Sequence, residues 1–479
     1  MTWETPARQR LRSAQIGRNY SAGSNNQESV ELSPDRVGVH EGGRMPPEVA
    51  ISVPTATHPC REGTYAMPAV LTPRATKAAT LPRFGRAALA LTVAATLVGA
   101  GTTPAPAAGP SPDPTMRDVA SQVLDSGVPG YAARVDDGRR TTVTAAGVAD
   151  RATGRPMTGR DQFEIGSVTK AFTATLVLQQ VDRARVDLDA PIDRYLPGVV
   201  PGGSEITVRM LLNHTSGLFQ YVADPGYFTR MEQDPYHVAT ERELLDIAFA
   251  HGPEFPPGQG WSYSNTNYIL LGMLLRKVTG RTMPDLVRRH IAVPLGLTRT
   301  YYPDPYARIT GPGYAHGYSV SFGDPAPTYV DVSDRPLGGW AGAGGAIIST
   351  PDEVSRFLSA VLRGQLFSSA ALTQMKTTVP LPDEVGVQGG YGLGLFRLDT
   401  VCGTVWAHAG TTRGHQTRAT ATEDGKRTAV ADITATPGIT ATPGGQTRYA
   451  QVVPAADTAL TCRMLNRPVP PTVTRSLTS

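Results

Sequence analysis

The chain has 479 residues, of which 40% are hydrophobic and 18% are charged, and its formal net charge is +4. This composition is ordinary for a globular protein, and the length suggests two or three domains or one long α+β unit. No cluster of lysine and arginine is interleaved with aromatic residues, so no nucleic-acid partner is expected. The 50 glycines and 41 prolines indicate many loops.

The N-terminal part of the sequence predicts export. Residues 1–66 are polar and without periodicity, so we expect them to be disordered. A basic stretch, an apolar run at 87–100 and a small-residue site at 105–107 are typical of a secretory signal peptide, placed at 67–108. The run is short for a bilayer span, so we expect no stable anchor, with a membrane anchor as the alternative. Met67 stands where such a peptide would begin, so residues 1–66 are interpreted as upstream sequence from a wrongly set start codon.

The three cysteines fall on both sides of this boundary. Cys60 lies in the upstream segment, which leaves Cys402 and Cys462 as an even pair in the exported domain. Secretion takes a protein into an oxidising compartment, so these two cysteines are expected to form a disulfide.

In chain order, the patterns predict strands at both ends of the domain and helices between them. A helix near 116–126 and β-rich runs at 131–137 and 141–150 come first, and the chain is mostly helical from about 182 to 300. Thr240 with Glu243 is a capping box, and Thr350, Pro351 and Glu353 begin another helix.

The C-terminal half begins with a loop-rich stretch at 301–345. The later expected elements are strands within 390–398, 402–410, 416–424 and 426–434, a helix at 449–464 and a disordered tail at 464–479. The whole pattern predicts an α+β architecture, in which helices flank one antiparallel sheet and a mainly helical region is inserted.

The segment FEIGSVTKAFTATLVLQQ at 163–180 carries the first candidate site. Gly166 permits a sharp turn, and Ser167 then lies at a helix N-terminus, where free backbone N–H groups and the helix dipole favour negative charge. Lys170 lies one turn along the same face. A hydroxyl, an amine and free N–H groups are the parts of an acyl-transfer nucleophile site. The alternative is an N-cap serine beside a solvated lysine.

Two further triplets favour the catalytic reading. Tyr263-Ser264-Asn265 precedes an apolar helix, and His408-Ala409-Gly410 ends an expected strand. A tyrosine in a loop is more often a packing residue, so the order and the element types of all three motifs carry the inference.

Together the motifs resemble the serine β-lactamase-like and D,D-peptidase superfamily, of the class C β-lactamase type. Within it the chain looks closest to the secreted D-alanyl-D-alanine carboxypeptidases. The resemblance covers about 112–463, and the placement of the two cysteines is similar too. Its supporting segments are GSVTKAF, VDLDAPIDRYLP, MLLNHTSGL, WSYSNTNY, GAIIST and YGLGL.

The chemistry and the resemblance together suggest roles for the proton-transfer groups. Ser167 is the expected nucleophile, and Lys170 must lose its proton to help it, so its pKa must fall from about 10.4. Tyr263, hydrogen-bonded into that pair, can relay a proton to the leaving amine. Either Lys170 or Tyr263 can be the base. No motif for zinc, phosphate or an α/β-hydrolase is present, and no cofactor or metal is expected.

The resemblance also implies the substrate-binding groups. Asn265 would hold the acyl-side amide, and His408 would replace the family's motif lysine. The backbone N–H groups of Ser167 and of Thr411, which follows Gly410, would form the oxyanion hole. The remaining candidates are Arg397 and Arg413 for a substrate carboxylate, with solvated surface charge as the alternative, and Trp340 as a cleft wall or packing residue.

The implied function is a serine-type D-alanyl-D-alanine carboxypeptidase acting through an acyl-enzyme on peptidoglycan stem peptides, with β-lactams as inhibitors or substrates and a monomeric state. The alternatives are a β-lactamase or esterase of the same superfamily and a catalytically idle penicillin- or peptidoglycan-binding protein. The chain departs from the family at Ala409, at His415 and at Phe396-Arg397-Leu398. These positions are expected to bear on recognition of the substrate's carboxylate, and His214 is interpreted as structural.

Overall fold

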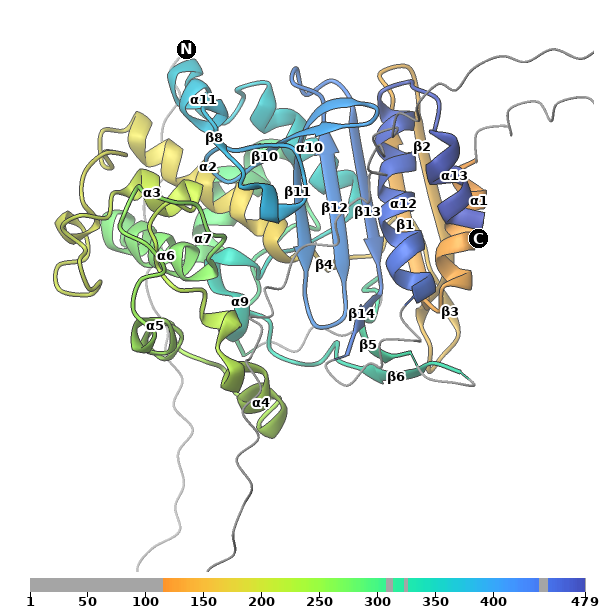
Figure 1. Cartoon of the computed structure of the whole chain (residues 1–479), viewed down its shortest axis with the longest axis horizontal. Coiled ribbons are helices and arrows are strands. Elements are labelled where there is room, and N and C mark those ends of the chain that lie inside the picture. The colour runs from red at the N-terminus through yellow and green to blue at the C-terminus, as the bar shows by residue number, and fades with distance from the viewer. Residues whose placement is uncertain (1–114, 307–312, 323–325, 439–446, 479) are drawn as a thin grey trace, which may run out of the picture. The chain divides into compact units, whose positions relative to one another are not determined.

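The described part of the chain is organised around an antiparallel sheet of nine strands (Figure 1). This computed structural model describes residues 115–306, 313–322, 326–438 and 447–478, which belong to the unit Gly63–Ser479. The strands are β1 (Gly130–Asp136), β2 (Thr141–Asp150), β3 (Arg155–Pro156), β8 (Val379–Pro380), β9 (Gly389–Tyr391), β10 (Phe396–Thr400), β11 (Gly403–Thr411), β12 (Gln416–Ala421) and β13 (Thr428–Ile433). Their order is β3-β2-β1-β13-β12-β11-β10-β9-β8, so the first strands of the domain pair with the last ones. The proposed signal peptide, Cys60 and the segment 1–66 lie outside the described residues.

Two smaller sheets complete the strand pairing. β4 (Phe163–Glu164) pairs with β7 (Ile348–Ser349), and β5 (Tyr318–Ser321) lies between β6 (Thr328–Asp331) and β14 (Ala435–Pro437). The β4–β7 pair is short, but it fixes the backbone immediately before Ser167.

The helices fall into two groups on the two faces of the large sheet (Figure 1). On one face lie α1 (Met116–Asp125), α12 (Thr447–Met464) and α13 (Pro471–Thr478). On the other face lie α2 (Thr169–Asp182), α10 (Pro351–Leu362) and a helical region. That region and its flanks contain α3 (Val208–Asn213), α4 (Pro225–Gln233), α5 (Glu241–Ala250), α6 (Asn265–Thr279), α7 (Met283–Val287), α8 (Val293–Leu295), α9 (Gly338–Ala341) and α11 (Ser369–Lys376). Its short helical turns are η1 (Gly166–Val168), η2 (Ile192–Arg194), η3 (Tyr221–Ala223), η4 (Arg288–Ala292), η5 (Gly342–Gly344) and η6 (Asp383–Val385).

The strand period of two distributes side chains between the two cores. In β13, Ala429, Ala431 and Ile433 pack with α1 and α12, whereas Val430 belongs to the core that contains α2 and α10. A sheet covered by helices on both faces confirms the predicted α+β class.

Local capping chemistry sets several helix starts as predicted. Thr240 and Glu243 form a reciprocal capping box at the start of α5. At α10 the Thr350 side chain accepts a hydrogen bond from the Glu353 N–H, and Pro351 occupies the first turn. α6 ends at Gly280 in the left-handed conformation.

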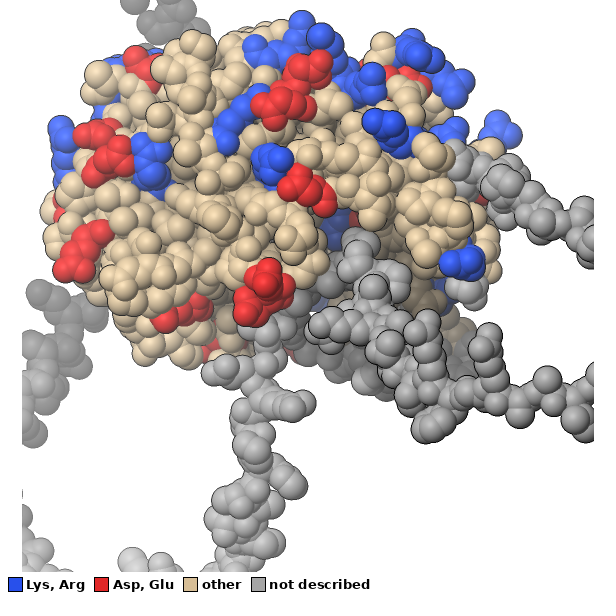
Figure 2. Space-filling model, turned by 45° about the horizontal axis from the view of Figure 1, so that its top comes forward, with Lys and Arg blue, Asp and Glu red and all other residues tan. Residues whose placement is uncertain are grey.

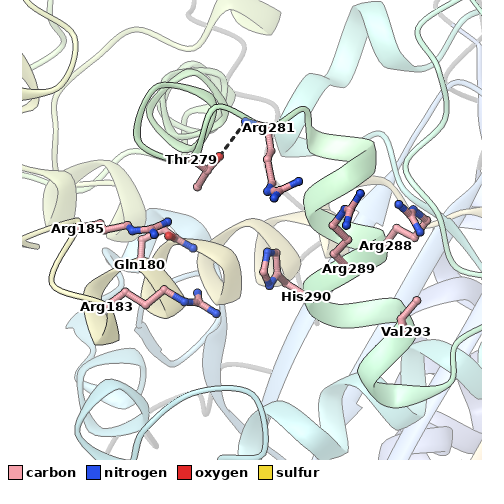
Figure 3. Close-up of a pocket in the computed structure, with 9 residues that line it drawn as sticks. All are labelled: Gln180, Arg183, Arg185, Thr279, Arg281, Arg288, Arg289, His290 and Val293. Atoms are coloured by element: carbon pink, nitrogen blue, oxygen red, sulfur yellow. Dashed lines mark hydrogen bonds between the residues drawn. The ribbon is translucent and has the colours of Figure 1, made fainter. Parts of the chain in front are cut away.

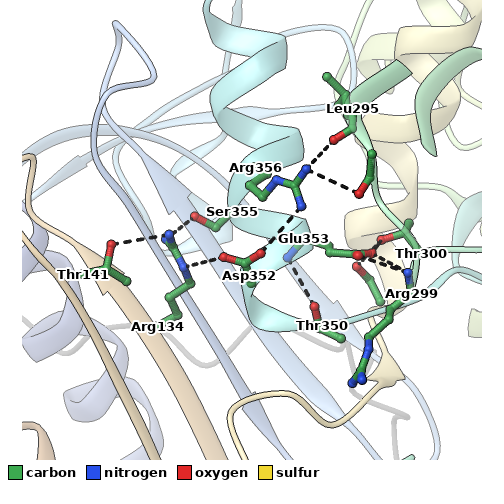
Figure 4. A network of polar contacts seen from close by, with 12 residues as sticks. Arg134, Thr141, Leu295, Arg299, Thr300, Thr350, Asp352, Glu353, Ser355 and Arg356 are labelled. Carbon is green, nitrogen blue, oxygen red and sulfur yellow. Dashed lines mark hydrogen bonds and ion pairs between the residues drawn. The ribbon is translucent and has the colours of Figure 1, made fainter. Parts of the chain in front are cut away.

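α10 is also tied to both of its neighbours by polar contacts (Figure 4). Arg134 on β1 reaches Asp352 at 3.1 Å and donates to the Ser355 hydroxyl at 2.6 Å. At the start of the helix, the Glu353 carboxylate accepts from the Arg299 backbone N–H at 3.0 Å. The helix is therefore held to the large sheet at one side and to the helical region at the other.

Some sequence expectations were wrong in detail. Helix α2 is buried on nearly all sides, including Thr173 and Gln180, so the alternative of a solvated Lys170 near its start was wrong. The stretch 301–345 is not one loop, since it contains β5, β6 and α9. The run 390–398 is divided between the short strands β9 and β10.

The expectation of a disordered tail from 464 was also wrong. The chain forms α13, and Leu477 is buried against the core that contains α1 and α12. Its apolar residues are few, but Val473 and Leu477 lie four apart and so face the same side of the helix.

Charged side chains are unevenly spread over the surface shown in Figure 2. Lysine and arginine gather toward the top of that view, whereas the lower left is mostly uncharged with scattered acidic groups. Among the described helices, none combines the length and apolar character that a bilayer crossing requires.

Candidate active site

The chain before Ser167 makes a turn that only glycine accommodates easily. Gly166 has φ +51°, and a Cβ at this position would lie 2.7 Å from the Thr411 backbone nitrogen. The turn brings Ser167 into η1, directly before α2, and leaves its side chain partly exposed. Ser167 is therefore accessible at the N-terminal end of a buried helix.

Lys170 is the most unusual residue of the site, because its side chain is fully buried. Its Nζ lies 3.2 Å from Ser167 Oγ, 2.5 Å from Asn265 Oδ1 and 2.8 Å from the Gly344 carbonyl oxygen. Within the described part of the chain it forms no ion pair with a carboxylate. Burial lowers the pKa of Lys170 well below its usual value, which favours a neutral amine.

The contacts of Lys170 orient that neutral amine. An amine has two N–H groups and one lone pair, and the oxygens of Asn265 and Gly344 can only accept hydrogen bonds. The lone pair is then directed at the Ser167 hydroxyl. This is the geometry of a general base beside a nucleophile.

Tyr263 lies beside the Lys170 amine, with its ring centroid 4.9 Å from Lys170 Nζ. Its hydroxyl is buried and has no close hydrogen-bond partner among the described residues, although the Ser167 hydroxyl lies near enough to act on its pKa. Burial raises the pKa of Tyr263, and the nearby Ser167 hydroxyl opposes that rise. The phenol therefore stays protonated and can donate a proton.

His214 holds the loop that carries Tyr263. It ends α3 in the left-handed conformation, and its Nδ1 accepts the Ser264 N–H at 3.2 Å. Its ring lies 4.4 Å from the Tyr263 ring. The structural interpretation of His214 therefore extends to positioning Tyr263.

Asn265 is the first residue of α6, whereas the sequence pattern placed the whole triplet before the helix. Its backbone N–H donates to Gln220 Oε1 at 2.9 Å while its side chain contacts Lys170. The helix start thus fixes both the backbone and the amide of this residue.

The end of β11 supplies backbone donors beside Ser167. A Cβ at Gly410 would lie 2.0 Å from the Ile165 carbonyl oxygen and 3.1 Å from the Ser167 nitrogen. Glycines at 166 and 410 therefore let the two chain segments touch, which places the Ser167 and Thr411 backbone nitrogens close together. Paired N–H groups of this kind can stabilise an oxyanion.

His408 on β11 is buried and uncharged. Its Nδ1 donates to the Ala409 carbonyl oxygen at 2.7 Å, and its Nε2 accepts from the Tyr391 hydroxyl at 3.2 Å. Burial is the main cause that lowers the pKa of His408 to about 3, with a smaller contribution from the nearby Lys170 side chain. The position that is lysine in the resembling family therefore contributes no cation here.

Two of the departures from the family pattern do not face the substrate side. Ala409 pairs with Arg418 on β12, and strand alternation directs its side chain away from the face of His408. His415 is fully buried, and its Nδ1 lies 3.1 Å from Asp432 Oδ2. His415 is therefore paired with Asp432 and Ala409 faces away from His408, and the expected bearing of these positions on carboxylate recognition stays a prediction.

The two arginine candidates differ in their surroundings. Arg397 forms an ion pair with Asp399 at 3.1 Å and is 40% exposed. Arg413 lies with its guanidinium carbon 5.4 Å from the Trp340 ring centroid, and its Nη1 is buried without a hydrogen-bond partner among the described residues. Burial, and then nearby Arg335, lower the pKa of Arg413 to about 10, so it remains a cation.

Trp340 packs under Arg413 and is 8% exposed, so it supports the arginine more than it lines open space. It lies four residues before Gly344, whose carbonyl contacts Lys170. Arg413 in turn lies two residues after Thr411. Arg413 and Trp340 therefore lie close in sequence to Thr411 and Gly344, the two residues whose backbone groups belong to the site around Ser167.

Cys402 and Cys462 lie at disulfide distance, with Cα atoms 5.1 Å apart. They connect the turn before β11 to α12, on the face opposite the catalytic residues. Among the described residues, no group of three or more histidine, cysteine and acidic side chains is arranged to hold a metal ion.

Sequence reasoning missed three partners of the site. These are the Gly344 carbonyl, the Tyr391 hydroxyl and His214 as a support of Tyr263. Gly344 directly precedes the segment GAIIST, and Tyr391 is the first residue of YGLGL; both segments support the family resemblance. The residue types alone did not predict the contacts that these two residues make.

Comparison with known proteins shows the family of the chain. Residues 116–453 match the family described as Beta-lactamase, and the chain belongs to this family. Its fold and motifs are those of the serine β-lactamase-like superfamily, and it is a serine hydrolase of this superfamily by class.

Individual relatives have diverse activities. Penicillin-binding protein 4 of Amycolatopsis lactamdurans is 29% identical over 337 residues, which are 69% of this chain and 78% of that protein. The structure of a D-stereospecific amidohydrolase from a Streptomyces species is 37% identical with a TM-score of 0.61, covering 67% of this chain and 95% of that one. D-amino acid amidase from Ochrobactrum anthropi SV3 is 29% identical with a TM-score of 0.59, covering 71% and 98%. The chain spans just under two thirds of two penicillin-binding proteins of Bacillus subtilis, 63% and 64% of their lengths.

Proposed function

We propose that the chain is a serine-type D-alanyl-D-alanine carboxypeptidase that cleaves peptidoglycan stem peptides through an acyl-enzyme. The proposal assigns Ser167 as nucleophile, Lys170 as base and Tyr263 as proton donor to the leaving group. It is supported by the buried Lys170, whose lowered pKa favours the neutral amine and whose Nζ lies 3.2 Å from Ser167 Oγ.

The reaction has two steps. Ser167 Oγ attacks the carbonyl carbon of the scissile peptide bond, and its proton passes to Lys170 Nζ. The backbone N–H groups of Ser167 and Thr411 stabilise the oxyanion, and the C–N bond breaks as the leaving amine takes a proton through Tyr263. Water then attacks the ester carbonyl carbon and gives one proton to Lys170 Nζ. The bond between the acyl carbon and Ser167 Oγ breaks, Oγ takes that proton, and the carboxylic acid product leaves.

The observation that favours a carboxypeptidase is Arg413. Its guanidinium is partly buried, stacked on Trp340 and left without an ion-pair partner among the described residues. A desolvated, unpaired guanidinium fork suits a carboxylate, and a C-terminal D-alanine supplies one on the leaving-group side. Asn265 and His408 complete the proposed substrate contacts, the latter as a neutral group.

A second candidate is a D-stereospecific amidohydrolase that acts on amides without a free C-terminal carboxylate. It is favoured by the 37% identity to the Streptomyces enzyme and by the absence of positive charge at His408. A β-lactamase or esterase is the further option within the superfamily.

A side-by-side assay distinguishes these activities. Release of D-alanine would be measured from a diacyl-Lys-D-Ala-D-Ala peptide, beside turnover of a D-amino acid amide, a chromogenic cephalosporin and a p-nitrophenyl ester. Ser167→Ala and a peptide ending in L-Ala-L-Ala are the controls. D-alanine release that depends on Ser167 supports the proposal, whereas efficient amide turnover without D-alanine release supports the second candidate.

Secretion is part of the proposal, because the proposed substrate lies outside the cytoplasmic membrane. The signal peptide at 67–108 motivates it. N-terminal sequencing of protein recovered from the culture medium should begin close to residue 109. Recovery of the intact chain only from the cell interior would contradict this location.

A further inference from the structure

A basic hollow lies at the end of α2 opposite to Ser167 (Figure 3). Its volume is about 600 Å³, and five arginines and one histidine contribute to its wall: Arg183, Arg185, Arg281, Arg288, Arg289 and His290. The other lining side chains are uncharged, and no acidic residue lines it. The 14 residues of α2 span about 20 Å, so this hollow is separate from the site around Ser167.

The arginines form two groups on opposite sides of the hollow (Figure 3). Arg183 and Arg185 follow the C-terminal end of α2. Arg281 follows the end of α6, and Arg288 and Arg289 begin η4. An anion bound between the groups would therefore meet guanidinium groups from two separate segments of the chain.

The charge of the hollow is only partly neutralised. Asp285 accepts from Arg281 at 2.9 Å, Arg288 at 3.1 Å and Arg289 at 2.6 Å, so three guanidinium groups share one carboxylate. Each guanidinium has five N–H donors, and most of these donors stay available. Three like charges held around one acid leave an excess of positive charge on this side.

The opposite side is not neutralised by any carboxylate in the described part of the chain. Arg183 donates only to the Gln179 carbonyl oxygen at 3.0 Å, and the Arg185 side chain has no hydrogen-bond or ion-pair partner there. Asp182 is close in sequence, but its carboxylate accepts from the Ser368 backbone N–H and hydroxyl. The two arginines are therefore free to bind an external anion.

The composition of the wall limits the chemistry of that anion. A guanidinium group can donate two parallel hydrogen bonds to two oxygens of one phosphate group. The hollow has room for about 20 water molecules, which is far more volume than one phosphate group occupies. Apart from His290 the lining has no aromatic ring on which a nucleic-acid base could stack. Burial, and then the charges of Arg183 and Arg281, lower the pKa of His290, so this ring adds no charge.

We propose that this hollow is a binding site for linked phosphate groups, either a free oligophosphate or a segment of a phosphodiester polymer. Arg183 and Arg185 hold one phosphate group, and the arginines around Asp285 hold another. The site is independent of the proposed hydrolase activity, since the residues of its wall do not contact Ser167, Lys170 or Tyr263.

Calorimetric titration of the purified protein with tripolyphosphate tests this site. We expect one-to-one binding that is at least tenfold tighter than binding of orthophosphate or of citrate, and that weakens between 50 and 200 mM salt, concentrations chosen for screening. Arg183→Ala/Arg185→Ala should weaken binding at least tenfold. Because both side chains are exposed and neither forms an ion pair among the described residues, the double variant should fold normally, which circular dichroism checks.

Matched variants and competitors make the result decisive. Arg139→Ala removes an exposed arginine from the β1–β2 turn and should leave tripolyphosphate binding unchanged. Ser167→Ala should also bind normally, which separates this site from the proposed function. If a poly(glycerol phosphate) chain competes with tripolyphosphate, the linked phosphate groups that bind here belong to a phosphodiester polymer. If it does not compete, the ligand is a free oligophosphate.

Three outcomes would overturn the assignment. The first is unchanged binding in the Arg183→Ala/Arg185→Ala variant, and the second is citrate binding as tightly as tripolyphosphate. The third is a single-stranded DNA oligomer that binds more tightly than tripolyphosphate through the same arginines, which would instead indicate nucleic acid.

Discussion

Lys170 and Asn265 come from two different helices, and their side chains meet at 2.5 Å between Nζ and Oδ1. Together with the Gly344 carbonyl, Asn265 occupies the N–H groups of the buried amine, which leaves its lone pair for Ser167. Asn265 therefore orients the proposed base in the free enzyme, in addition to its expected contact with substrate.

Lys170→Met should reduce acylation of Ser167 at least 1000-fold, by our order-of-magnitude estimate for loss of an activating base. Its unfolding free energy should stay within about 2 kcal/mol of the wild type, because removal of a buried amine offsets the loss of two hydrogen bonds. Lys277→Met removes an exposed lysine on α6 and is the matched control. Stopped-flow acylation and urea unfolding measure the two effects, and normal acylation in Lys170→Met would exclude Lys170 as base.

The acylation rate should rise with pH on the acidic side. A lysine whose folded pKa lies well below its unfolded value loses its proton at lower pH, and only the neutral form can accept the proton of Ser167. His408, with a pKa of about 3, should add no further limb above pH 5, roughly two units higher. Acylation measured across pH at constant ionic strength checks this. A rate that rises only near pH 10, about the usual lysine pKa, would show that the amine is normally charged.

Arg413→Ala should raise KM for a D-Ala-D-Ala peptide and lower kcat/KM by about 10- to 100-fold, the loss of one charge-assisted pair. The same variant should hydrolyse an amide without a carboxylate almost as fast as the wild type. Arg397→Ala is the matched control, because Arg397 is already paired with Asp399. Equal losses in the two variants would remove Arg413 from substrate recognition.

The pairing of Cys402 and Cys462 should contribute about 4 kcal/mol on the loop-entropy description for a separation of 60 residues. Cys402→Ser/Cys462→Ser should therefore have a lower Tm by several degrees while keeping its catalytic residues. Thiol titration of the secreted protein under denaturing conditions should find no free thiol. Two free thiols per chain would contradict the pairing.

Local chemistry made much of the fold predictable. Capping residues such as Thr240 and Thr350 act over three positions, and strand alternation acts over two, so short windows contain the whole signal. α2 was harder to describe, because Thr173 and Gln180 are buried by helices and strands from distant parts of the chain. Tertiary packing of this kind leaves no local period in the sequence.

The catalytic side chains were predictable as a set, but their contacts were not. Gly344 acts through its carbonyl oxygen, which every residue type possesses, so no letter could indicate it. His415 looked like a substrate-facing substitution until the structure showed its pairing with buried Asp432. The basic hollow was equally hidden, since Arg185 and Arg289 are over 100 residues apart and only the fold brings them together.

The central claim is that Ser167 becomes acylated, and intact-protein mass spectrometry after incubation with a fluorescent penicillin tests it most directly. We expect one adduct per chain, located on the peptide that contains Ser167, and complete loss of that adduct in Ser167→Ala. An adduct that persists in Ser167→Ala, or that maps to a different residue, would contradict the account.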